Sequence, residues 1–385
     1  MKEGWEYKKL GEVATFTRGL TYSKNDEAEI SDNIVLRSNN VDLSTGKLNF
    51  DELKYLKPEF LIPEEKKVKK GSLLMCMSNG SKIHLGKVAL INDDYPYAFG
   101  GFMALVTPNE ELNPQFFNYS LSSPEYKDFI KKLSEGANIN NIKVKELELF
   151  TIPVPPLSEQ QSIVDYLDSA FAKIDAMKAN AEKALNEAKA LFQASLKEML
   201  EPKEGWEEKI FGDVCWYNKN NGIHKGTRYV GMEHIEQGAG SLLGTISSDD
   251  VLSNTFAFSK GDVLYGRLRP YLKKVIVADF DGCCSTEIFP IQSKEIVASF
   301  LMYWFLTDEI TNKVNATCAG CRMPRGNMND VLKFDISYPS IQEQQSIVET
   351  LDSLKSKVDR LQANYDKISQ ECDALKQAIL RQVFT

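Results

Sequence analysis

An internal repeat limits the possible folds of this chain more than any other feature of its sequence. Residues 159–169 read EQQSIVDYLDS and residues 343–353 read EQQSIVETLDS, so nine of eleven positions are identical at an offset of 184. Further upstream, the pentapeptide KEGWE at 2–6 recurs at 203–207. A repeat of this length indicates a duplicated structural unit. We therefore predict two tandem copies: globular parts at 1–156 and 202–340, each followed by a long helix, at 157–201 and 341–385.

The stretch after each repeat has the alternating four- and three-residue spacing of a coiled-coil seam. The expected seam residues are Ile163, Leu167, Ala170, Ile174, Met177, Ala181, Ala184, Ala188, Leu191 and Ser195 in the first copy, and Ile347, Leu351, Leu354, Val358, Leu361, Tyr365, Ile368, Cys372, Leu375 and Ile379 in the second. The two helices match in length, and the small seam of the first complements the bulky seam of the second. We therefore predict antiparallel pairing within one chain, with pairing between chains as the alternative.

Ser/Thr followed three residues later by Glu/Gln is the sequence pattern of a helix capping box. Ser158 with Gln161 and Ser340 with Glu343 fit this pattern at the starts of the two long helices. We therefore expect each serine to be the residue that caps its helix.

The globular parts alternate short apolar runs with turn residues, a pattern typical of short strands. In the first part we expect strands at 34–36, 72–77, 87–91 and 102–106 and one or two helices within 114–133. In the second part we expect strands at 229–232, 263–265, 274–278 and 288–291 and a matching helix at 295–314. The predicted fold is α+β: two tandem α/β domains, separated and joined by two long helices that form an antiparallel intramolecular coiled coil, with a pseudo-two-fold axis.

Composition restricts the function. Hydrophobic residues make up 43% and charged residues 26% of the chain, an ordinary globular mix, and the formal net charge is −8. Residues 202–340 hold 15 Lys and Arg against 17 Asp and Glu, and none of the four predicted segments is basic overall. Any affinity for nucleic acid must then come from local clusters or from a partner. No apolar run is long enough for a membrane span and no signal-peptide pattern is present, so we expect a cytoplasmic protein.

The sequence gives little indication of catalysis or metal binding. It has neither a Walker-type phosphate loop nor a G-x-G-x-x-G motif. Asn113-Pro114-Gln115-Phe116 comes near the Asn-Pro-Pro-aromatic motif of amino-methyltransferases, but the third residue differs and the segment opens a predicted helix. The cysteines Cys283, Cys284, Cys318 and Cys321 could supply a zinc site, although buried thiols are the simpler interpretation. The three histidines, His84, His224 and His234, lack metal-ligand spacing; His84 lies in a polar loop where it could touch DNA. We expect no catalytic and no metal site.

The duplicated arrangement as a whole resembles the specificity subunit of a type I restriction–modification system. The resemblance is carried by 155–161 and 339–345, each opening a long helix, by Gly4-Trp5 and Gly205-Trp206, and by 261–264 leading into 267–272, in the family's order along the whole chain. It implies two target-recognition domains separated by two conserved helices, in a chain that is not itself catalytic and holds no cofactor. It also implies three kinds of partner: double-stranded DNA, methyltransferase subunits and restriction subunits. The resemblance implies two methyltransferase subunits, which use S-adenosylmethionine, and restriction subunits that use ATP and Mg.

The resemblance does not identify the residues that read bases, so we choose them by their chemistry. Arg, Lys, Asn and Ser in loops are the side chains that read base edges, although the same residues also occur as solvated turns and caps. The candidates are Arg37, Asn39, Asn40, Asn79, Ser81, Lys82, Asn140 and Lys143 in the first part, and Arg267, Arg269, Tyr271, Lys273, Lys274, Arg322, Arg325 and Asn327 in the second. We favour Arg267 and Arg269, because alternating residues of an extended segment share one face.

Two equivalent helices paired antiparallel would present two different readers to DNA in inverted orientation. The sequence therefore predicts recognition of a bipartite, asymmetric DNA target with an unread spacer whose length the helices set. The alternatives are a coiled-coil scaffold with two protein-binding domains, which the acidic balance favours, and an enzyme that carries its own specificity region.

Overall fold

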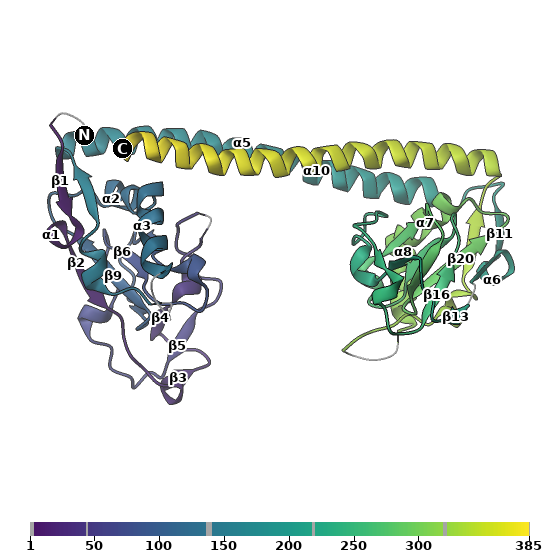
Figure 1. The fold of residues 1–385 in the computed structure, drawn as a ribbon, viewed down its shortest axis with the longest axis horizontal. Helices are drawn as coiled ribbons and strands as arrows, with labels where there is room; N and C mark the ends of the chain where they lie inside the picture. Colours follow the sequence, from purple (N-terminus) through teal and green to yellow (C-terminus); the bar gives the residue numbers. More distant parts are fainter. Residues whose placement is uncertain (1–3, 44, 136–140, 218–219, 319–321, 385) are drawn as a thin grey trace. The chain divides into compact units, whose positions relative to one another are not determined.

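The computed structural model describes residues 4–43, 45–135, 141–217, 220–318 and 322–384 (Figure 1). The chain divides into two compact units: unit 1 comprises residues 1–180 and 366–385, and unit 2 comprises residues 181–365. The two long helices, α5 (Leu157–Leu200) and α10 (Ile341–Phe384), are each shared between the units. Each unit therefore combines one globular part with the start of the helix that follows it and the end of the other helix.

The globular part of unit 1 contains two small sheets and a strand pair. The first sheet is antiparallel, in the order β2 (Ala14–Arg18), β9 (Met103–Pro108), β6 (Leu73–Cys76), β7 (Val88–Leu90). The second has the order β3 (Glu27–Ala28), β5 (Lys54–Leu56), β4 (Ile34–Leu36), β8 (Ala98–Phe99), with β4 parallel to β8. Strand β1 (Glu6–Lys9) pairs with β10 (Thr151–Val154). The helices are α1 (Leu10–Val13), α2 (Pro114–Ser120), α3 (Pro124–Glu135) and α4 (Val144–Leu147).

Unit 2 repeats this plan. Its first sheet has the order β12 (Cys215–Tyr217), β20 (Ile288–Ser293), β17 (Val263–Gly266), β18 (Val275–Val277). Its second has the order β13 (Asn221–Gly222), β16 (Thr255–Phe258), β19 (Gly282–Ser285), β14 (Arg228–Val230), β15 (Ile246–Ser247). Strand β11 (Glu207–Ile210) pairs with β21 (Asp335–Tyr338). The helices are α6 (Phe211–Val214), α7 (Ala298–Leu306), α8 (Asp308–Ala316) and α9 (Met328–Val331).

The predicted strands and the α+β fold are confirmed, and each predicted globular helix is a pair of helices. In unit 1, Pro124 begins α3, since a proline is tolerated in the first turn of a helix but not in its interior. In unit 2, Thr307 ends α7 and caps α8, with its side chain accepting a hydrogen bond from the Ile310 N–H.

The hydrophobic core of each unit extends from the sheets onto both long helices. In unit 1 it includes Val164 and Leu167 from the start of α5, and Leu380 and Phe384 from the end of α10. In unit 2 it includes the residues 184 positions away from these: Val348 and Leu351 of α10, and Leu196 and Leu200 of α5. The duplication therefore reaches the packing itself, because equivalent side chains bury equivalent faces in both copies.

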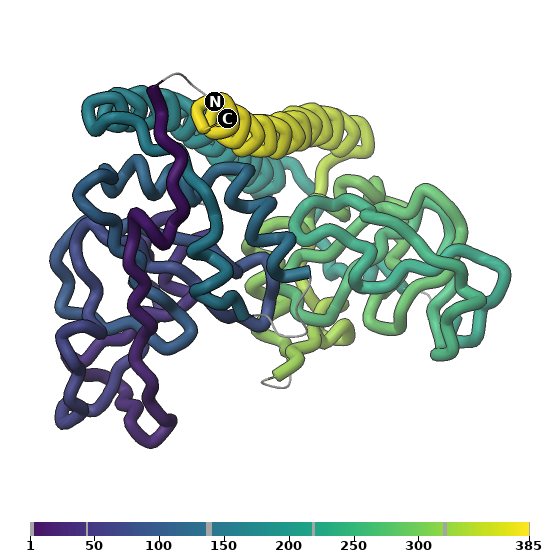
Figure 2. Tube along the Cα trace, turned by 60° about the vertical axis from the view of Figure 1, so that its left-hand side comes forward, coloured from purple at the N-terminus to yellow at the C-terminus, as the bar shows by residue number. Residues whose placement is uncertain are grey.

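Within each unit the two long helices pack antiparallel, as predicted (Figure 1, Figure 2). In unit 1, Lys178 Nζ lies 3.6 Å from Asp373 Oδ1, and the Cys372 thiol donates to the Ile174 carbonyl at 3.7 Å. In unit 2, Lys189 Nζ donates to Gln362 Oε1 at 2.8 Å. In unit 1, Lys376 Nζ also donates to Asp175 Oδ1 at 2.5 Å, so the step from Asp175 to Lys178 along α5 is matched by a step back from Lys376 to Asp373 along α10.

The predicted seam is right for α10, where nine of its ten residues are buried or half-buried and Leu375 is exposed, whereas in α5 seven of its ten residues are buried or half-buried. One predicted row, 167, 174, 181, 188 and 195, faces inward. In the other row Ile163 and Ala170 are half-buried, as predicted, but Met177, Ala184 and Leu191 are exposed, and for these three the prediction is wrong. Their successors Lys178, Leu185 and Phe192 take the inward positions.

The capping-box prediction also needs correction. Helix α5 begins at Leu157, so Ser158 lies inside its first turn, and the Pro156 carbonyl accepts from the Glu159 and Gln160 N–H groups. At α10 the serine part of the prediction is confirmed, since Ser340 Oγ accepts from the Glu343 N–H at 3.4 Å. The Glu343 carboxylate instead accepts from the indole of Trp206.

None of the described helices is long and apolar enough to cross a bilayer.

The repeated sequence has the same structural role in both copies: its side chains hydrogen bond each globular part to the long helix that follows it. We call this set of contacts the latch. The indole Nε1 of Trp5 donates to Glu159 at 2.9 Å, and that of Trp206 donates to Glu343 at 3.4 Å. The glycine before each tryptophan has a left-handed backbone, with φ of 82° at Gly4 and 89° at Gly205, which explains the repeated Gly-Trp pair.

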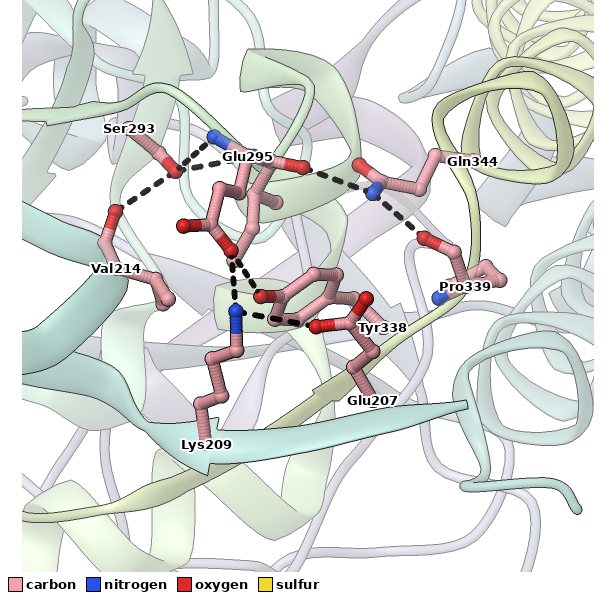
Figure 3. A network of polar contacts seen from close by, with 9 residues as sticks. Glu207, Lys209, Val214, Ser293, Glu295, Tyr338, Pro339 and Gln344 are labelled. Carbon is pink, nitrogen blue, oxygen red and sulfur yellow. Dashed lines mark hydrogen bonds and ion pairs between the residues drawn. The ribbon is translucent and has the colours of Figure 1, made fainter. Parts of the chain in front are cut away.

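Two further contacts of the repeat are equivalent in both copies. Gln344 is completely buried, and its Oε1 accepts from the Val297 N–H at 2.8 Å. Its Nε2 donates to the carbonyls of Glu295 and Pro339 at 3.1 and 2.9 Å (Figure 3). Gln160 makes the same three contacts in unit 1, to Asn113, Glu111 and Pro155. The hydroxyls of Tyr119 and Tyr303 donate to Asp168 and Asp352 respectively. The two positions at which the repeats differ, 165/349 and 166/350, are exposed in both copies.

Candidate nucleic-acid interface

Three of the polar loops predicted in the first globular part come together in unit 1. The loop after β4 meets the loop after β6, because Asn79 Nδ2 donates to Ser38 Oγ at 2.9 Å. The loop after β6 meets the segment before α4, through the bridge between Ser78 and Asn141 and the Ile142 N–H donating to the Met77 carbonyl at 2.8 Å. The predicted candidate Asn140 lies outside the described residues.

The candidates in these loops have different surroundings. The prediction for Asn40 as a base reader is wrong: its side chain is 0% exposed, and its amide donates to the Asn49 and Glu52 carbonyls while accepting from the Arg37 N–H. Asn40 therefore holds the loop together. Asn79 is half-buried and also structural, since its Oδ1 accepts from the Ser81 N–H.

The remaining candidates of unit 1 reach solvent. Asn39, Ser81, Lys82 and Lys143 are exposed; Asn39 contacts Glu52, Lys82 donates to the Ser134 carbonyl, and Lys143 lies 3.8 Å from Glu146. Arg37 is half-buried, and within the described part of the chain its Nε is buried with no hydrogen-bond partner.

In unit 2, the loop after β17 meets the segment before α9. Leu268 forms a bridge with Arg325, the Gly326 N–H donates to the Arg267 carbonyl at 2.9 Å, and the Arg269 N–H donates to the Pro324 carbonyl at 2.8 Å. These contacts bring together Arg267 and Arg325, which share Glu287: Arg267 Nε lies 3.0 Å from one carboxylate oxygen and Arg325 Nε 2.8 Å from the other.

The expectation that Arg267 and Arg269 share one face of an extended segment is wrong. Strand β17 ends at Gly266, and Arg269 has a left-handed backbone with φ of 52°, which leads into the 3₁₀ turn Pro270–Leu272. Alternation of faces applies only to extended backbone. The exposed Arg269 side chain therefore does not follow the face of Arg267.

Three further candidates of unit 2 are committed to holding the loops. Lys273 Nζ donates to the Leu306 carbonyl at the end of α7 and to Asp308, and its side chain is largely buried. Lys274 Nζ donates to the Met232 carbonyl at 2.6 Å. Asn327 caps α9 by accepting from the Asn329 N–H. Lys273 and Lys274 are therefore corrected to structural residues, whereas Tyr271 and Arg322 are exposed, as a reader must be.

The two loop junctions occupy the same place in the two copies of the fold. The pair Ser78–Asn141 matches Leu268–Arg325, and the hydrogen bond from Ile142 to Met77 matches that from Gly326 to Arg267. The N–H of Met77 donates to the Phe102 carbonyl, and the N–H of Arg267 to the Glu287 carbonyl, each at 2.9 Å. We name these three positions the strand-end triad: Met77, Phe102 and Asn141 in unit 1, and Arg267, Glu287 and Arg325 in unit 2.

The chemistry of the triad differs between the copies. In unit 1 it is apolar and neutral, and the Phe102 side chain is 72% exposed although it is large and hydrophobic. In unit 2 it carries two guanidinium groups on one carboxylate. The same loops also carry Arg269 and Arg322, whose side chains are exposed, so they hold four arginines in a chain of net charge −8. An exposed aromatic residue and clustered arginines are the side chains that contact base edges and phosphates.

Reasoning from the sequence missed Phe102 and Glu287. Phe102 was included in a predicted strand, but it precedes β9, in the turn after Gly100 and Gly101. Glu287 was missed because acidic residues were not considered as members of a DNA-contacting site. No repeat in the sequence marks these two residues, because they are unlike; only the structure shows that each immediately precedes the equivalent strand, β9 or β20.

The alternative chemistries have little support in the described residues. Asn113 is the cap of α2, its Oδ1 accepting from the N–H groups of Gln115 and Phe116. Cys283 and Cys284 lie in β19, where burial raises the pKa of both thiols; Cys321 lies outside the described residues. Among the described residues, no three His, Cys, Asp or Glu side chains are grouped to hold a metal ion.

The histidines have local roles in the described structure. His224 Nδ1 is hydrogen bonded to Thr255 Oγ1 at 2.8 Å, and His234 Nδ1 accepts from the Gly231 N–H at 2.9 Å. Burial, and then the nearby Lys87, lower the pKa of His84.

Comparison with known proteins identifies the family. The model of the type I restriction modification DNA specificity domain matches residues 2–187 and 203–370, and the chain belongs to this family. It is 25% identical to the StySPI specificity subunit of Salmonella potsdam and 25% identical to the EcoKI specificity subunit of Escherichia coli K12, in each case over 100% of this chain and 89% of the relative.

Solved structures share the fold. One, from work on complex assembly and conformational transition of the type I R-M system, matches with a TM-score of 0.76 at 19% identity, covering 99% of this chain and 97% of that one. The HsdS subunit of Thermoanaerobacter tengcongensis matches with a TM-score of 0.55 at 19% identity, covering 100% and 97%.

Proposed function

We propose that this protein is the DNA-recognition subunit of a type I restriction–modification complex and that each unit reads one half of a split target. The observation that carries this proposal is the strand-end triad. The same three backbone positions carry Met77, Phe102 and Asn141 in one unit, of which Phe102 and Asn141 are exposed and Met77 is buried, and Arg267, Glu287 and Arg325 in the other. A duplicated scaffold with different side chains at equivalent positions reads two half-sites of different sequence.

The chain acts without catalysing a reaction itself. Its relatives are specificity subunits of type I restriction enzymes. In this proposal two methyltransferase subunits bind S-adenosylmethionine, restriction subunits bind ATP and Mg, and the complex works in the cytoplasm. The net charge of −8 fits such a division of labour, because partners that grip the phosphate backbone supply the sequence-independent affinity.

The acidic balance also fits a second function, a scaffold whose two globular parts bind proteins. Selection from a randomised duplex library separates the two. The complex of this chain with its methyltransferase subunit is incubated with the library, and the retained DNA is sequenced.

The proposal predicts enrichment of two separated, unlike blocks of fixed bases. Enrichment that is the same with and without this chain would contradict the proposal and leave the scaffold function. Specific DNA binding falls steeply with salt, so the selection is repeated at two salt concentrations to separate base reading from phosphate contact.

A further inference from the structure

Glu287 joins the two arginines of the strand-end triad in unit 2. Its two carboxylate oxygens accept from different residues: Oε2 from Arg267 Nε at 3.0 Å and Oε1 from Arg325 Nε at 2.8 Å. The Glu287 side chain is 21% exposed, so the ion pairs are partly shielded from solvent. A carboxylate held on both sides has little freedom to move, and it fixes both guanidinium groups.

Both contacts use Nε, which leaves the far edge of the Arg267 guanidinium unused. The described residues supply no hydrogen-bond acceptor to its Nη1 and Nη2. The guanidinium also lies over the Phe289 ring, 5.4 Å from its centroid, and the Arg267 main chain is bonded to Glu287 and Gly326. The plane of the guanidinium is therefore fixed by a charge, a ring and the backbone, while a pair of parallel N–H groups remains available.

A pair of parallel N–H donors matches two neighbouring acceptors. In the major groove only guanine presents such a pair, O6 and N7; adenine and cytosine present a donor amino group, and thymine pairs its O4 with a methyl group. A backbone phosphate can also accept both N–H groups. The carboxylate of Glu287 argues against phosphate as the ligand, because it places a negative charge beside the site.

We propose that Arg267 reads a guanine in the half-site bound by unit 2 and that Glu287 is the positioning residue that makes this reading selective. The inference rests on the proposed function. Glu287 directs the guanidinium by its bond to Nε and disfavours a shift of Arg267 onto the phosphates. Arg325 holds the other carboxylate oxygen. Because Met77, Phe102 and Asn141 stand at these positions in unit 1, the guanine preference belongs to one half-site only.

The test uses the complex of the full chain with its methyltransferase subunit and the duplex target obtained from library selection. Each guanine of the target is replaced in turn by 7-deazaguanine, which lacks the N7 acceptor. Binding is measured by fluorescence anisotropy for the wild type and for Arg267→Lys, Arg325→Lys and Glu287→Gln. The matched controls are Arg381→Lys and Glu125→Gln, which alter an arginine–glutamate ion pair of unit 1 whose Nε and Oε1 are 3.7 Å apart.

For the wild type, we expect 7-deazaguanine to lower the affinity by about 5- to 150-fold when it replaces one particular guanine of one half-site. Arg267→Lys should bind the natural target more weakly than the wild type by the same factor. Its affinity should not fall further when that guanine is replaced by 7-deazaguanine. Glu287→Gln lowers the ratio of target to base-substituted affinity, because its single carbonyl oxygen cannot serve both arginines. Its affinity for unrelated DNA stays equal or rises, because a negative charge has been removed.

Three results would overturn the inference while leaving the proposed function intact. The first is that no 7-deazaguanine substitution in either half-site changes target selectivity. The second is that Arg267→Lys loses the same affinity at every base pair, as phosphate binding would produce. The third is that Glu287→Gln loses the same affinity on target and on unrelated DNA, as a purely structural role would produce. Absence of sequence-selective binding by the wild-type complex would overturn the proposed function and the inference together.

Discussion

Polar side chains in the interface loops have two different roles, and burial separates them. Asn40 donates to a carbonyl of the following loop and Lys273 and Lys274 donate to carbonyls of distant segments. Arg269 and Tyr271 extend into solvent. Reasoning from the sequence grouped them together, because the residue types that read bases also satisfy loop backbone. The contacts across the fold that commit Lys273 to α7, some 33 positions away, leave no local pattern in the sequence.

Phe102 gives a prediction at the residue scale. With its side chain 72% exposed, it adds little to the stability of unit 1, and an exposed ring beside polar loops is suited to contact a thymine methyl group. Phe102→Ala should reduce affinity for the target by about 1–3 kcal/mol, the range for one altered base contact. The loss should vanish when the half-site bound by unit 1 is already replaced.

The measurement combines DNA binding with a thermal melt of the same variant. Ile30→Ala, which truncates an exposed apolar residue of unit 1 outside the candidate loops, is the control and should leave both unchanged. A lowered melting temperature for Phe102→Ala would mean that the ring stabilises the fold and would contradict a role in reading DNA.

Glu295 gives a prediction about pH. Lys209 and then Tyr338 hydrogen bond to this carboxylate and lower its pKa below the ordinary value of 4.5 (Figure 3). A carboxyl group whose folded pKa is lowered contributes stability above its unfolded pKa and loses that contribution as the pH falls through the folded pKa. Glu295→Gln should therefore destabilise unit 2 at pH 7, and the difference from wild type should shrink as the pH drops below about 4.5.

Melting temperatures between pH 7 and pH 3 test this expectation. Glu111→Gln is the matched control, because Lys8 contacts Glu111 in unit 1 as Lys209 contacts Glu295 in unit 2. Unit 1 has Val154 where unit 2 has Tyr338, so Glu111→Gln should have the smaller effect on stability. A Glu295→Gln difference that stays constant over the whole range would show that the carboxylate charge contributes nothing.

At the scale of elements, the identity of the two repeats has a direct physical cause. Glu159, Gln160 and Asp168, and their counterparts 184 positions later, each contact the globular part of their own unit. The sequence predicted the helices and their starts from this repeat, but the contacts themselves could not be predicted. A buried glutamine that serves three main-chain groups looks in the sequence like any exposed helix residue.

Gln344 tests the latch. Gln344→Ala removes the partner of the half-buried Val297 N–H and of the carbonyls of Glu295 and Pro339, and the loss should cost about 1–3 kcal/mol. Gln345→Ala, at the adjacent exposed position, should stay within about 0.5 kcal/mol of wild type. Hydrogen exchange should accelerate at Val297 in the first variant only; equal exchange in both would contradict the latch.

The heptad spacing of α5 does not determine which residues in the second half of the helix face inward. Alanine is acceptable in a seam or on a solvent face, so Ala184 and Ala188 could not fix which of two neighbouring rows turns inward. The bulky residues decided it in the structure: Leu185 is 3% exposed and Phe192 8%, whereas Leu191 is 60% exposed. The bulky seam of α10 was predicted correctly because nearly every position there is large and apolar.

Leu185 and Leu191 therefore form a matched pair. Leu185→Ala should destabilise unit 2 by about 2–5 kcal/mol, as for a buried leucine, and Leu191→Ala should have almost no effect. Urea unfolding followed by circular dichroism measures both. Equal losses, or a larger loss for Leu191→Ala, would restore the seam expected from the heptad pattern.

At the scale of the whole molecule, duplication made the fold predictable and divergence made the site unpredictable. The equivalent cores and the repeated residues of the long helices are visible in the sequence as apolar runs or repeats, and the first sheet has the same strand order in both units. The strand-end triad is not visible in the sequence, because its positions are equivalent in backbone but unlike in chemistry, and an unlike pair such as Phe102 and Glu287 leaves no repeat to find. That divergence is what a protein with one scaffold and two different half-sites requires.

The most direct test of the central claim is methylome sequencing of cells that express this chain with the methyltransferase subunit of its system, with wild type and Arg267→Lys side by side. We expect a split motif, methylated on both strands and absent without this chain, and a change in one half of that motif in the variant. A stable complex that produces no new motif, or a variant that alters both halves equally, would contradict the account of one reader in each unit.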